Sequence, residues 1–301
     1  MQIKKAIVTG GAGFIGSNLV DRLIDMGVEV HVIDNLSTGK AENVNPKAIF
    51  HKLDISTIEH PQWNWKDADV IFHLAAMARV QPSIDSPIPY HDSNVTGTLK
   101  MLQVAKTLRV SKFVFSSSSS VYGNASVPTS ESHKLNPMSP YALHKLIGEQ
   151  YCTLWSKLYG IDTVSLRYFN VYGNRMSLDG AYRLAIPIFA SQIKEGIPCA
   201  INNDGNQRRD YTYVEDVINA NILAATSSII FNGEAYNVGN GNNVSINEVV
   251  DMMGGEKSYG NKVIEPFETL ASYAKIDLDL EWKPTGDLQK WIINYMENLN
   301  A

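Results

Sequence analysis

The chain has 301 residues, of which 44% are hydrophobic and 19% are charged, and its formal net charge at pH 7 is −5. This composition is typical of a globular protein, and the acidic balance argues against a broad nucleic-acid-binding face, which needs clustered lysine and arginine. The two cysteines, Cys152 and Cys199, form no CxxC motif, and no HxxxH or HExxH spacing occurs, so we expect no metal site. No apolar run approaches the ~20 residues of a membrane helix and no signal peptide is visible, so we expect a cytoplasmic protein without a membrane partner.

Short β-branched runs alternate with longer helical patterns in the first half of the chain. Near-continuous apolar strands separated by helices indicate a parallel sheet that is covered on both faces. We therefore expect an α/β fold, a doubly wound Rossmann-type sheet. The expected strands cover residues 5–9, 29–34, 48–54, 70–74, 112–116 and 163–167, and the expected helices cover 14–26, 95–108 and about 140–158.

The pattern changes after about Tyr168, where elements shorten and Gly, Asn and Pro become frequent. We expect a dinucleotide-binding domain in residues 1–168, rejoined by part of 210–240. Residues 169–301 are expected to form a smaller and irregular substrate-binding portion. No flexible linker separates the two, so we expect them to share an interface.

A glycine-rich turn follows the first expected strand and opens the first expected helix. The sequence TGGAGFIG (residues 9–16) places Gly10, Gly13 and Gly16 in a TGxxGxxG spacing. Glycine permits a tight turn and a close approach of the backbone to a pyrophosphate, and a helix N-terminus supplies free N–H groups with a partial positive charge. Because the turn lies between a strand and a helix, the pattern predicts a dinucleotide-binding site.

Two carboxylates follow the second and third expected strands. Asp34 lies twenty-four residues after Gly10. A carboxylate there accepts hydrogen bonds from both hydroxyls of the adenosine ribose and repels a 2′-phosphate, which favours NAD over NADP. Asp54 either binds the adenine amino group or caps the segment that follows it.

Tyr141 and Lys145 are four residues apart in an expected helix, so their side chains lie on one face. A tyrosine has a pKa near ~10 and is a poor base at neutral pH, whereas a lysine cation nearby lowers that pKa. The serine run of residues 116–120 ends the fifth expected strand, at the edge where such sheets bind ligands. A hydroxyl there can hydrogen-bond a reacting oxygen of the substrate and shuttle its proton to the tyrosine.

These features resemble the extended short-chain dehydrogenase/reductases, and within them the nucleotide-sugar 4-epimerases. The resemblance covers nearly the whole chain. The further motifs that carry it are FHLAA (72–76), NVTGT (94–98), FSSSSSVYG (115–123), SPY (139–141), LRYFNVYG (166–173) and RDY (209–211).

The resemblance implies a role for each matching residue. Tyr141 takes the proton of the sugar 4-hydroxyl while hydride leaves C4 for NAD, Lys145 supports Tyr141, and Ser118 is its hydroxyl partner. Asn170 and Arg209 hold the diphosphate, and Asn202 lies near the base. The residues implied to contact NAD are Gly10, Gly13, Phe14, Ile15, Gly16, Asp34, Asn35, Asp54, Ile55, Ala75, Asn94, Lys145 and Tyr168. Those implied to contact the nucleotide-diphosphate sugar are Ser118, Ser119, Asn170, Asn202, Arg209 and Ser272.

The choice of reaction depends on the end of the serine run. Related 4,6-dehydratases carry an Asp-Glu pair where this chain has Ser119 and Ser120, so dehydration lacks its acid/base groups, and decarboxylation of UDP-glucuronate is disfavoured by the same absence. In the family, a residue before the C-terminal helix admits or excludes an acetamido group at C2. Alignment puts the small Ser272 there, and the segment 179–182 is similar to epimerases of UDP-N-acetylhexosamines. We expect 4-epimerisation of UDP-N-acetylglucosamine and UDP-N-acetylgalactosamine through a transient 4-keto sugar.

One stretch departs from the family. A second diphosphate-binding arginine is expected near Glu265, but no arginine follows Arg209. Lys262 is a candidate substitute, and we expect a weaker affinity for UDP-sugars than is usual in the family.

Other functions stay open. The alternatives are a UDP-glucose 4-epimerase or another nucleotide-sugar epimerase or reductase. A non-catalytic NAD-binding regulator on the same fold is disfavoured, because Ser118, Tyr141 and Lys145 are all present. A homodimer is expected, formed through the helices of 95–108 and 140–158.

Overall fold

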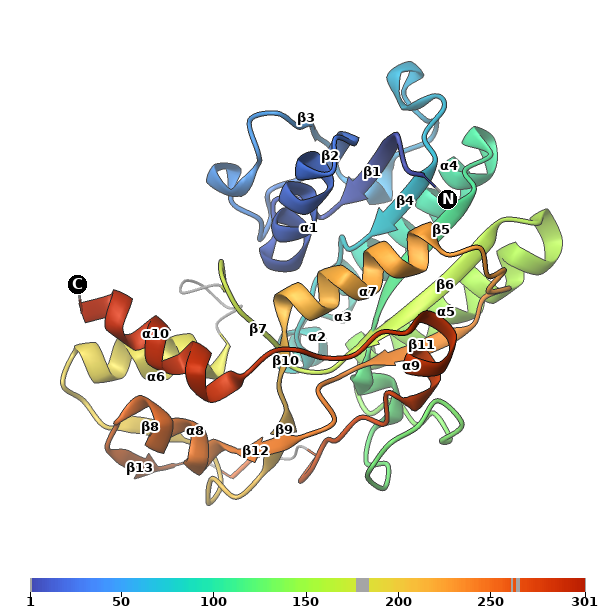
Figure 1. Ribbon diagram of the computed structural model, residues 1–301. Coiled ribbons are helices and arrows are strands. Elements are labelled where there is room, and N and C mark those ends of the chain that lie inside the picture. Colours follow the sequence, from blue (N-terminus) through green and yellow to red (C-terminus); the bar gives the residue numbers. More distant parts are fainter. Residues whose placement is uncertain (1, 177–183, 261, 264–265, 301) are drawn as a thin grey trace.

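A parallel β-sheet forms the centre of the computed structural model, which describes residues 2–176, 184–260, 262–263 and 266–300. Within these residues the sheet has seven strands in the order β11-β6-β5-β4-β1-β2-β3, and every neighbouring pair is parallel (Figure 1). The strand order reverses between β1 and β4, which confirms the doubly wound Rossmann-type fold. The strands are β1 (Lys5–Thr9), β2 (Glu29–Asp34), β3 (Ile49–Lys52), β4 (Val70–His73), β5 (Lys112–Ser118), β6 (Asp162–Tyr168) and β11 (Ala235–Val238).

Helices cover both faces of this sheet (Figure 1). The α-helices of the described residues are α1 (Phe14–Asp25), α2 (Val80–Asp85), α3 (Pro87–His91), α4 (Gly97–Leu108), α5 (Pro140–Tyr159), α6 (Ala185–Lys194), α7 (Val214–Thr226), α8 (Ile246–Met253), α9 (Ala274–Leu280) and α10 (Leu288–Asn300). Because successive side chains of a strand point to opposite faces, each strand supplies two cores. Val114 of β5 packs with α1 and α7, whereas its neighbours Phe113 and Phe115 pack with α4 and α5.

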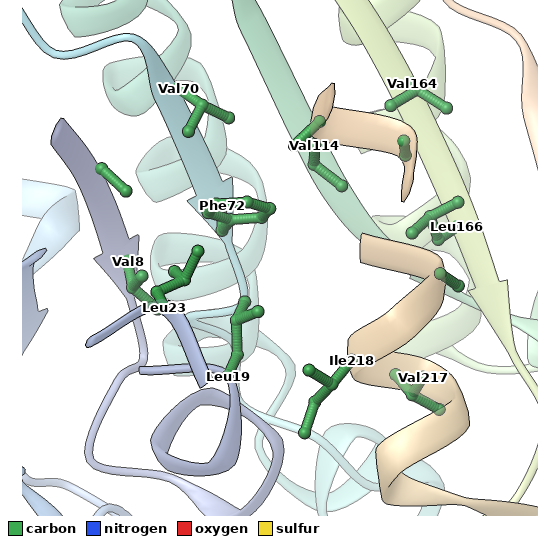
Figure 2. Packing of buried hydrophobic residues seen from close by; sticks show 14 of the residues in the cluster. Val8, Leu19, Leu23, Val70, Phe72, Val114, Val164, Leu166, Val217 and Ile218 are labelled. Carbon is green, nitrogen blue, oxygen red and sulfur yellow. The ribbon is translucent and has the colours of Figure 1, made fainter. Parts of the chain in front are cut away.

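The core beneath α1 and α7 is closely packed. Figure 2 shows Phe72 projecting from β4 near Leu19 and Leu23 of α1, with Ile218 of α7 on the other side of Leu19. Phe72 and its neighbours are fully buried. Burial of this apolar surface is the main force that holds the two helices on the sheet.

We predict that Phe72→Ala destabilises the protein by about 3–5 kcal/mol, because it removes buried contacts and leaves a cavity. The matched control is Trp63→Ala, since Trp63 is 89% exposed and its loss is expected to cost less than about 0.5 kcal/mol. Urea unfolding followed by circular dichroism measures both changes. Similar losses for the two variants would contradict this description of the core.

The bounds of the elements agree with the sequence expectations where the signals are local. The strands expected at 5–9 and 29–34 are confirmed residue for residue. β5 extends two residues beyond its expected end, because Ser117 and Ser118 still pair with β6. The helix expected at 95–108 begins at Gly97, after a π-helical turn.

The segment 210–240, part of which is expected to rejoin residues 1–168, returns to the central sheet. β11 pairs with β6 at the edge, and α7 packs over the centre, so the segment 210–240 contributes a strand and a helix. α9 and Trp282 also join the core under α1 and α7, although they lie within the range expected for the substrate-binding portion.

The rest of the chain after Tyr168 forms a smaller layer beside the sheet, in which α6, α8 and α10 share a separate core (Figure 1). Three two-stranded sheets, β7–β10, β9–β12 and β8–β13, accompany these helices in the described residues. Their strands are β7 (Val171–Tyr172), β8 (Cys199–Ile201), β9 (Arg208–Asp210), β10 (Thr212–Tyr213), β12 (Asn243–Ser245) and β13 (Lys257–Tyr259).

No helix in the described part of the chain has both the length and the apolar character needed to cross a membrane. Among the same residues, no group of three or more His, Cys, Asp or Glu side chains is arranged to hold a metal ion.

Candidate active site

A cavity of about 1080 Å³ opens at the carboxyl edge of the sheet. Its wall is formed by residues that follow β1, β2, β4, β5 and β6, by the first turns of α1 and α5, and by part of β9. Open α/β sheets bind ligands at this edge, beside the point where the strand order reverses. The volume slightly exceeds the ~300–1,000 Å³ that is usual for one small-molecule site, so the cavity has room for a large ligand or for two adjacent ones.

The glycine turn lies at one end of the cavity. Gly10 has a φ of +72°, and a Cβ there would lie 2.7 Å from the backbone nitrogen of Ala75. A Cβ on Gly16 would lie 2.2 Å from the carbonyl oxygen of Gly10. Only glycine fits these positions, and the first turn of α1 can therefore approach the cavity with its free N–H groups.

Asp34 lies at the end of β2, next to this turn. Its Oδ2 accepts a hydrogen bond from the backbone N–H of Ala12 (3.0 Å), and its Oδ1 accepts one from Leu36 (2.8 Å). Burial raises the pKa of the Asp34 carboxyl, and the two backbone hydrogen bonds oppose that shift. The fixed carboxylate oxygens keep lone pairs that can accept hydrogen bonds from a diol.

Helix α5 carries the candidate catalytic pair into the cavity. The Ser139 side chain caps the helix by accepting from the backbone N–H of Ala142 (3.2 Å), and Pro140 stands in its first turn. Tyr141 and Lys145 then follow on one face, with the Lys145 Nζ 6.0 Å from the centre of the Tyr141 ring. Lys145 is held by its hydrogen bond to the carbonyl oxygen of Ser116 (2.6 Å).

Burial acts on both members of this pair. Desolvation lowers the pKa of Lys145 to about 8, opposed by the nearby carboxylate of Glu149. Desolvation also raises the pKa of Tyr141, and the side-chain hydrogen bond from Ser118 lowers it. A phenolate at Tyr141 therefore depends on its two polar neighbours, the lysine cation and the serine hydroxyl.

The serine run ends β5 at the cavity. Ser116 and Ser117 are buried, and Ser118, Ser119 and Ser120 all line the wall. Hydroxyl groups thus occupy the positions at which a carboxylate pair would be needed for elimination. Proton exchange with Tyr141 is the chemistry that this part of the wall supports.

Most residues singled out from the sequence come together in the cavity. Those that line it are Gly10, Gly13, Phe14, Ile15, Gly16, Asp34, Asn35, Ile55, Ala75, Ser118, Ser119, Tyr141, Lys145, Tyr168, Asn170 and Arg209. They derive from segments far apart in the chain, and the parallel sheet brings their strand ends to one edge.

Two residues expected to contact NAD do not line the cavity. Asp54 caps the 3₁₀ turn of residues 55–57, because its Oδ1 accepts from the backbone N–H of Ser56 (2.8 Å). Asn94 bonds the backbone of Met77 with both ends of its amide (2.7 and 2.8 Å), so it fixes the loop after β4 from behind.

Two residues expected to contact the substrate also lie outside the cavity wall. The backbone N–H of Ser272 donates to Thr129 O (2.8 Å), and the Ser272 carbonyl oxygen accepts from the side-chain amide of Asn237 (3.1 Å). These bonds fix the segment around Ser272 against the residues near Thr129. Asn202 is exposed, and its carbonyl oxygen accepts from Gln207 (3.0 Å). The gate at Ser272 therefore stays a prediction. Segment 179–182 and Glu265 lie outside the described residues.

The sequence analysis missed several residues of the wall. Arg79 and Gln81 line it from the start of α2, and the signal that could have identified them is their position shortly after the carboxyl end of β4. Lys262, proposed above as a substitute cation, does line the cavity, as Arg209 does. The described cavity wall therefore includes Arg79, Arg209 and Lys262 besides Lys145.

Comparison with known proteins identifies this arrangement. The model of the NAD dependent epimerase/dehydratase family matches residues 6–239. The chain belongs to this family. It is 39% identical, over 81% of its length and 80% of the relative's, to a UDP-glucose 4-epimerase of Mycolicibacterium smegmatis.

Solved structures agree over the full length. A UDP-N-acetylglucosamine 4-epimerase from Methanobrevibacter ruminantium, in complex with UDP-N-acetylmuramic acid, is 36% identical with a TM-score of 0.91, covering 99% of this chain and 100% of that one. A UDP-glucuronic acid 4-epimerase from Bacillus cereus, in complex with UDP-glucuronic acid and NAD, is 32% identical with a TM-score of 0.90, covering 98% and 99%. The chain is thus an NAD-dependent enzyme of the UDP-sugar 4-epimerase group.

The residues present fit NAD. The turn is so close that a Cβ at Gly16 would meet the chain itself, which leaves the backbone of α1 open to a pyrophosphate. Asp34 is the last residue of β2, the position at which a carboxylate binds the adenosine ribose in such sheets. NAD supplies an acceptor for hydride when it is bound.

Proposed function

We propose that this enzyme inverts C4 of UDP-N-acetylglucosamine and UDP-N-acetylgalactosamine through a transient 4-keto sugar. The observation that carries the proposal is the joint placement of Ser118, Tyr141 and Lys145 at one wall of a cavity that continues to the glycine turn. The acetylated sugar is favoured by the similarity to the Methanobrevibacter ruminantium enzyme over the whole chain.

The three residues have distinct tasks in this proposal. Tyr141 removes the proton of the 4-hydroxyl, and Ser118 lies beside it to relay that proton. Lys145 provides the positive charge that favours the Tyr141 phenolate. With NAD bound, the hydride removed from C4 would return to the opposite face of the keto carbon, and Tyr141 would return the proton to the oxygen. Tyr141 then regains its starting protonation state, and the sugar regains its oxidation state.

The diphosphate of the substrate is assigned to Arg209, Asn170 and Lys262. Asn170 is held by Asp210 O (3.2 Å) and Thr269 Oγ1 (3.3 Å) beside Arg209 on β9. Lys262 supplies a second cation in place of the arginine that this chain lacks. A lysine is a point charge and cannot form the two parallel hydrogen bonds of an arginine, which agrees with the expected weaker affinity.

The test is turnover by the purified protein without added NAD, with C4 inversion followed by proton NMR. UDP-N-acetylglucosamine is offered in one sample and UDP-glucose in another. Conversion of the acetylated sugar supports the proposal. Conversion of UDP-glucose alone would replace it with a UDP-glucose 4-epimerase, the function favoured by the relative from Mycolicibacterium smegmatis.

A pH dependence follows from Lys145. Because its pKa is about 8, kcat is expected to fall as the pH rises through about 8, when the lysine loses the charge that supports Tyr141. Lys145→Arg keeps a cation above this pH and is expected to retain a lower activity without that alkaline fall. An unchanged alkaline limb in the arginine variant would contradict the role given to Lys145.

A homodimer belongs to the same proposal. Leu143, Leu154 and Leu158 are 46%, 42% and 59% exposed, and their spacing puts them along one side of α5. An apolar stripe on a long helix is suited to pack against its copy. Light scattering after size-exclusion chromatography measures the mass in solution.

A further inference from the structure

A buried ion pair joins the catalytic helix α5 to strand β6. Glu149 of α5 and Arg167 of β6 are 6% and 4% exposed. Arg167 Nε donates to Glu149 Oε1 (2.9 Å), and its Nη2 donates to Oε2 (2.6 Å), so the guanidinium and carboxylate meet in a bidentate pair. The family assignment and the proposed reaction give this pair no task.

Helix α5 and strand β5 meet through three side chains of the helix. Tyr141, Lys145 and Glu149 succeed one another at intervals of four residues, which places them on one face. Tyr141 hydrogen-bonds Ser118, Lys145 bonds the carbonyl oxygen of Ser116, and Glu149 Oε1 accepts from the hydroxyl of Ser117. The Glu149 contact therefore lies between the other two along the strand.

The network continues away from the helix. Arg167 Nη1 donates to the hydroxyl of Tyr122 (2.7 Å), which donates to Asn237 Oδ1 of β11 (2.7 Å). The Asn237 amide in turn holds Thr129 O (2.9 Å). Glu149 is thus fixed by an arginine whose third nitrogen, Nη1, is also hydrogen-bonded, and neither partner can shift without leaving a buried charge or donor unpaired.

We propose that Glu149 is a positioning residue for the reaction: its carboxylate, held by Arg167, fastens α5 to Ser117 and so fixes Tyr141 against Ser118. The inference rests on the proposed function for its consequence on turnover. Its structural part concerns the contact between Tyr141 and Ser118, which can be measured without any sugar.

Loosening the contact between Tyr141 and Ser118 is expected to raise the pKa of Tyr141. The hydrogen bond from Ser118 lowers the pKa of Tyr141, so a strand that moves away from α5 leaves the pKa of Tyr141 higher. The other titratable groups that act on Lys145, the neighbour of Tyr141, are Glu149 and Cys152 on α5. His73 at the end of β4 also interacts with Lys145. None of these is removed by a change at Ser117.

The test uses Ser117→Ala, which deletes the contact and keeps the ion pair. Its matched control is Ser165→Ala, a buried serine on the adjacent strand β6 whose hydroxyl lacks a nitrogen or oxygen partner. Phenolate formation is followed by absorbance at 295 nm with NAD present, and the same titration of a second protein that also carries Tyr141→Phe is subtracted.

We expect Ser117→Ala to raise the pKa of Tyr141 by about half a unit and to lower kcat by about tenfold with KM nearly unchanged. The acid limb of the kcat profile should move to higher pH with it. The double variant E149L/R167M removes the same clamp while keeping the core filled and the net charge constant, and it is expected to raise the pKa of Tyr141 likewise. Because the Glu149 carboxylate also raises the pKa of Lys145, the alkaline limb of this variant should move to lower pH, whereas that of Ser117→Ala should not.

Equal Tyr141 titrations in Ser117→Ala, Ser165→Ala and the unaltered protein would overturn the inference. A loss of thermal stability without a change in the titration would overturn it also, because that is the behaviour of a merely structural contact. If the unaltered protein turns over no UDP-hexose, the proposed function fails, but the Tyr141 titration still decides the role of Glu149.

Discussion

Replacing Tyr141 by phenylalanine is expected to lower kcat for C4 inversion by about three orders of magnitude, since it removes the group that accepts the 4-hydroxyl proton. The ring remains, so the fold and the cavity wall are preserved. Tyr141 lies next to Ser118 and near Lys145, and no other phenol among the described cavity-lining residues except Tyr168 could take its place. Tyr168 is occupied, because its hydroxyl bonds Ser116 and Asn221.

The control for this prediction is Tyr159→Phe. Tyr159 ends the same helix and is 41% exposed, far along α5 from the cavity. Steady-state kinetics, NAD content and the melting temperature should be measured for both proteins. A Tyr141→Phe protein that keeps NAD and its melting temperature but turns over substrate at the unaltered rate would remove Tyr141 from the mechanism.

Replacing Gly16 by alanine is expected to weaken NAD binding by about thirty- to a hundredfold, a loss of about 2–3 kcal/mol. The new Cβ would lie 2.2 Å from the carbonyl oxygen of Gly10, and that atom is backbone, so the turn itself must move. Since Gly10 also lies against Ala75, the displacement carries to the loop after β4. Turnover should be lost in proportion to the bound NAD.

Gly260→Ala is the matched control for the glycine turn. A Cβ at Gly260 would be 3.7 Å from its nearest neighbour, Ile201 O, which is an ordinary contact. Calorimetric titration with NAD should give this variant the affinity of the unaltered protein. Wild-type affinity in Gly16→Ala would contradict the close approach of backbone and pyrophosphate on which the cofactor site depends.

Local signals made the sheet and the cofactor end of the site predictable. The turn at residues 9–16 has to contain glycine because a Cβ at Gly16 would collide with the backbone of Gly10. The glycine spacing that meets this requirement is visible in the sequence. The start of α5 is equally local, since Ser139 caps it and Pro140 fits its first turn. Tyr141 and Lys145 then follow from helix geometry alone.

Long-range contacts made the rest unpredictable. Asn237 bonds Tyr122 across 115 residues of sequence. The segment 210–240 is expected to rejoin the sheet, but no local pattern specifies that its strand pairs with β6 at the edge. A single side chain can also serve two local purposes. The sequence allows Asp54 either to contact adenine or to cap the following turn, and in the structure Asp54 caps the turn. The role of Ser272 stays a prediction, because its backbone joins segments that are far apart in sequence, and an alignment does not specify such a contact.

Deuterium at C4 of UDP-N-acetylglucosamine distinguishes hydride transfer from proton removal at carbon when the sugar is incubated with the purified enzyme and no added NAD. We propose that C4 is inverted by hydride leaving and returning within one active site, while Tyr141 transfers only the hydroxyl proton. NMR and mass spectrometry of the product should then show the galacto sugar with its deuterium still on C4. Inverted product that has lost the deuterium to water would contradict the claim, since it would require proton removal from carbon.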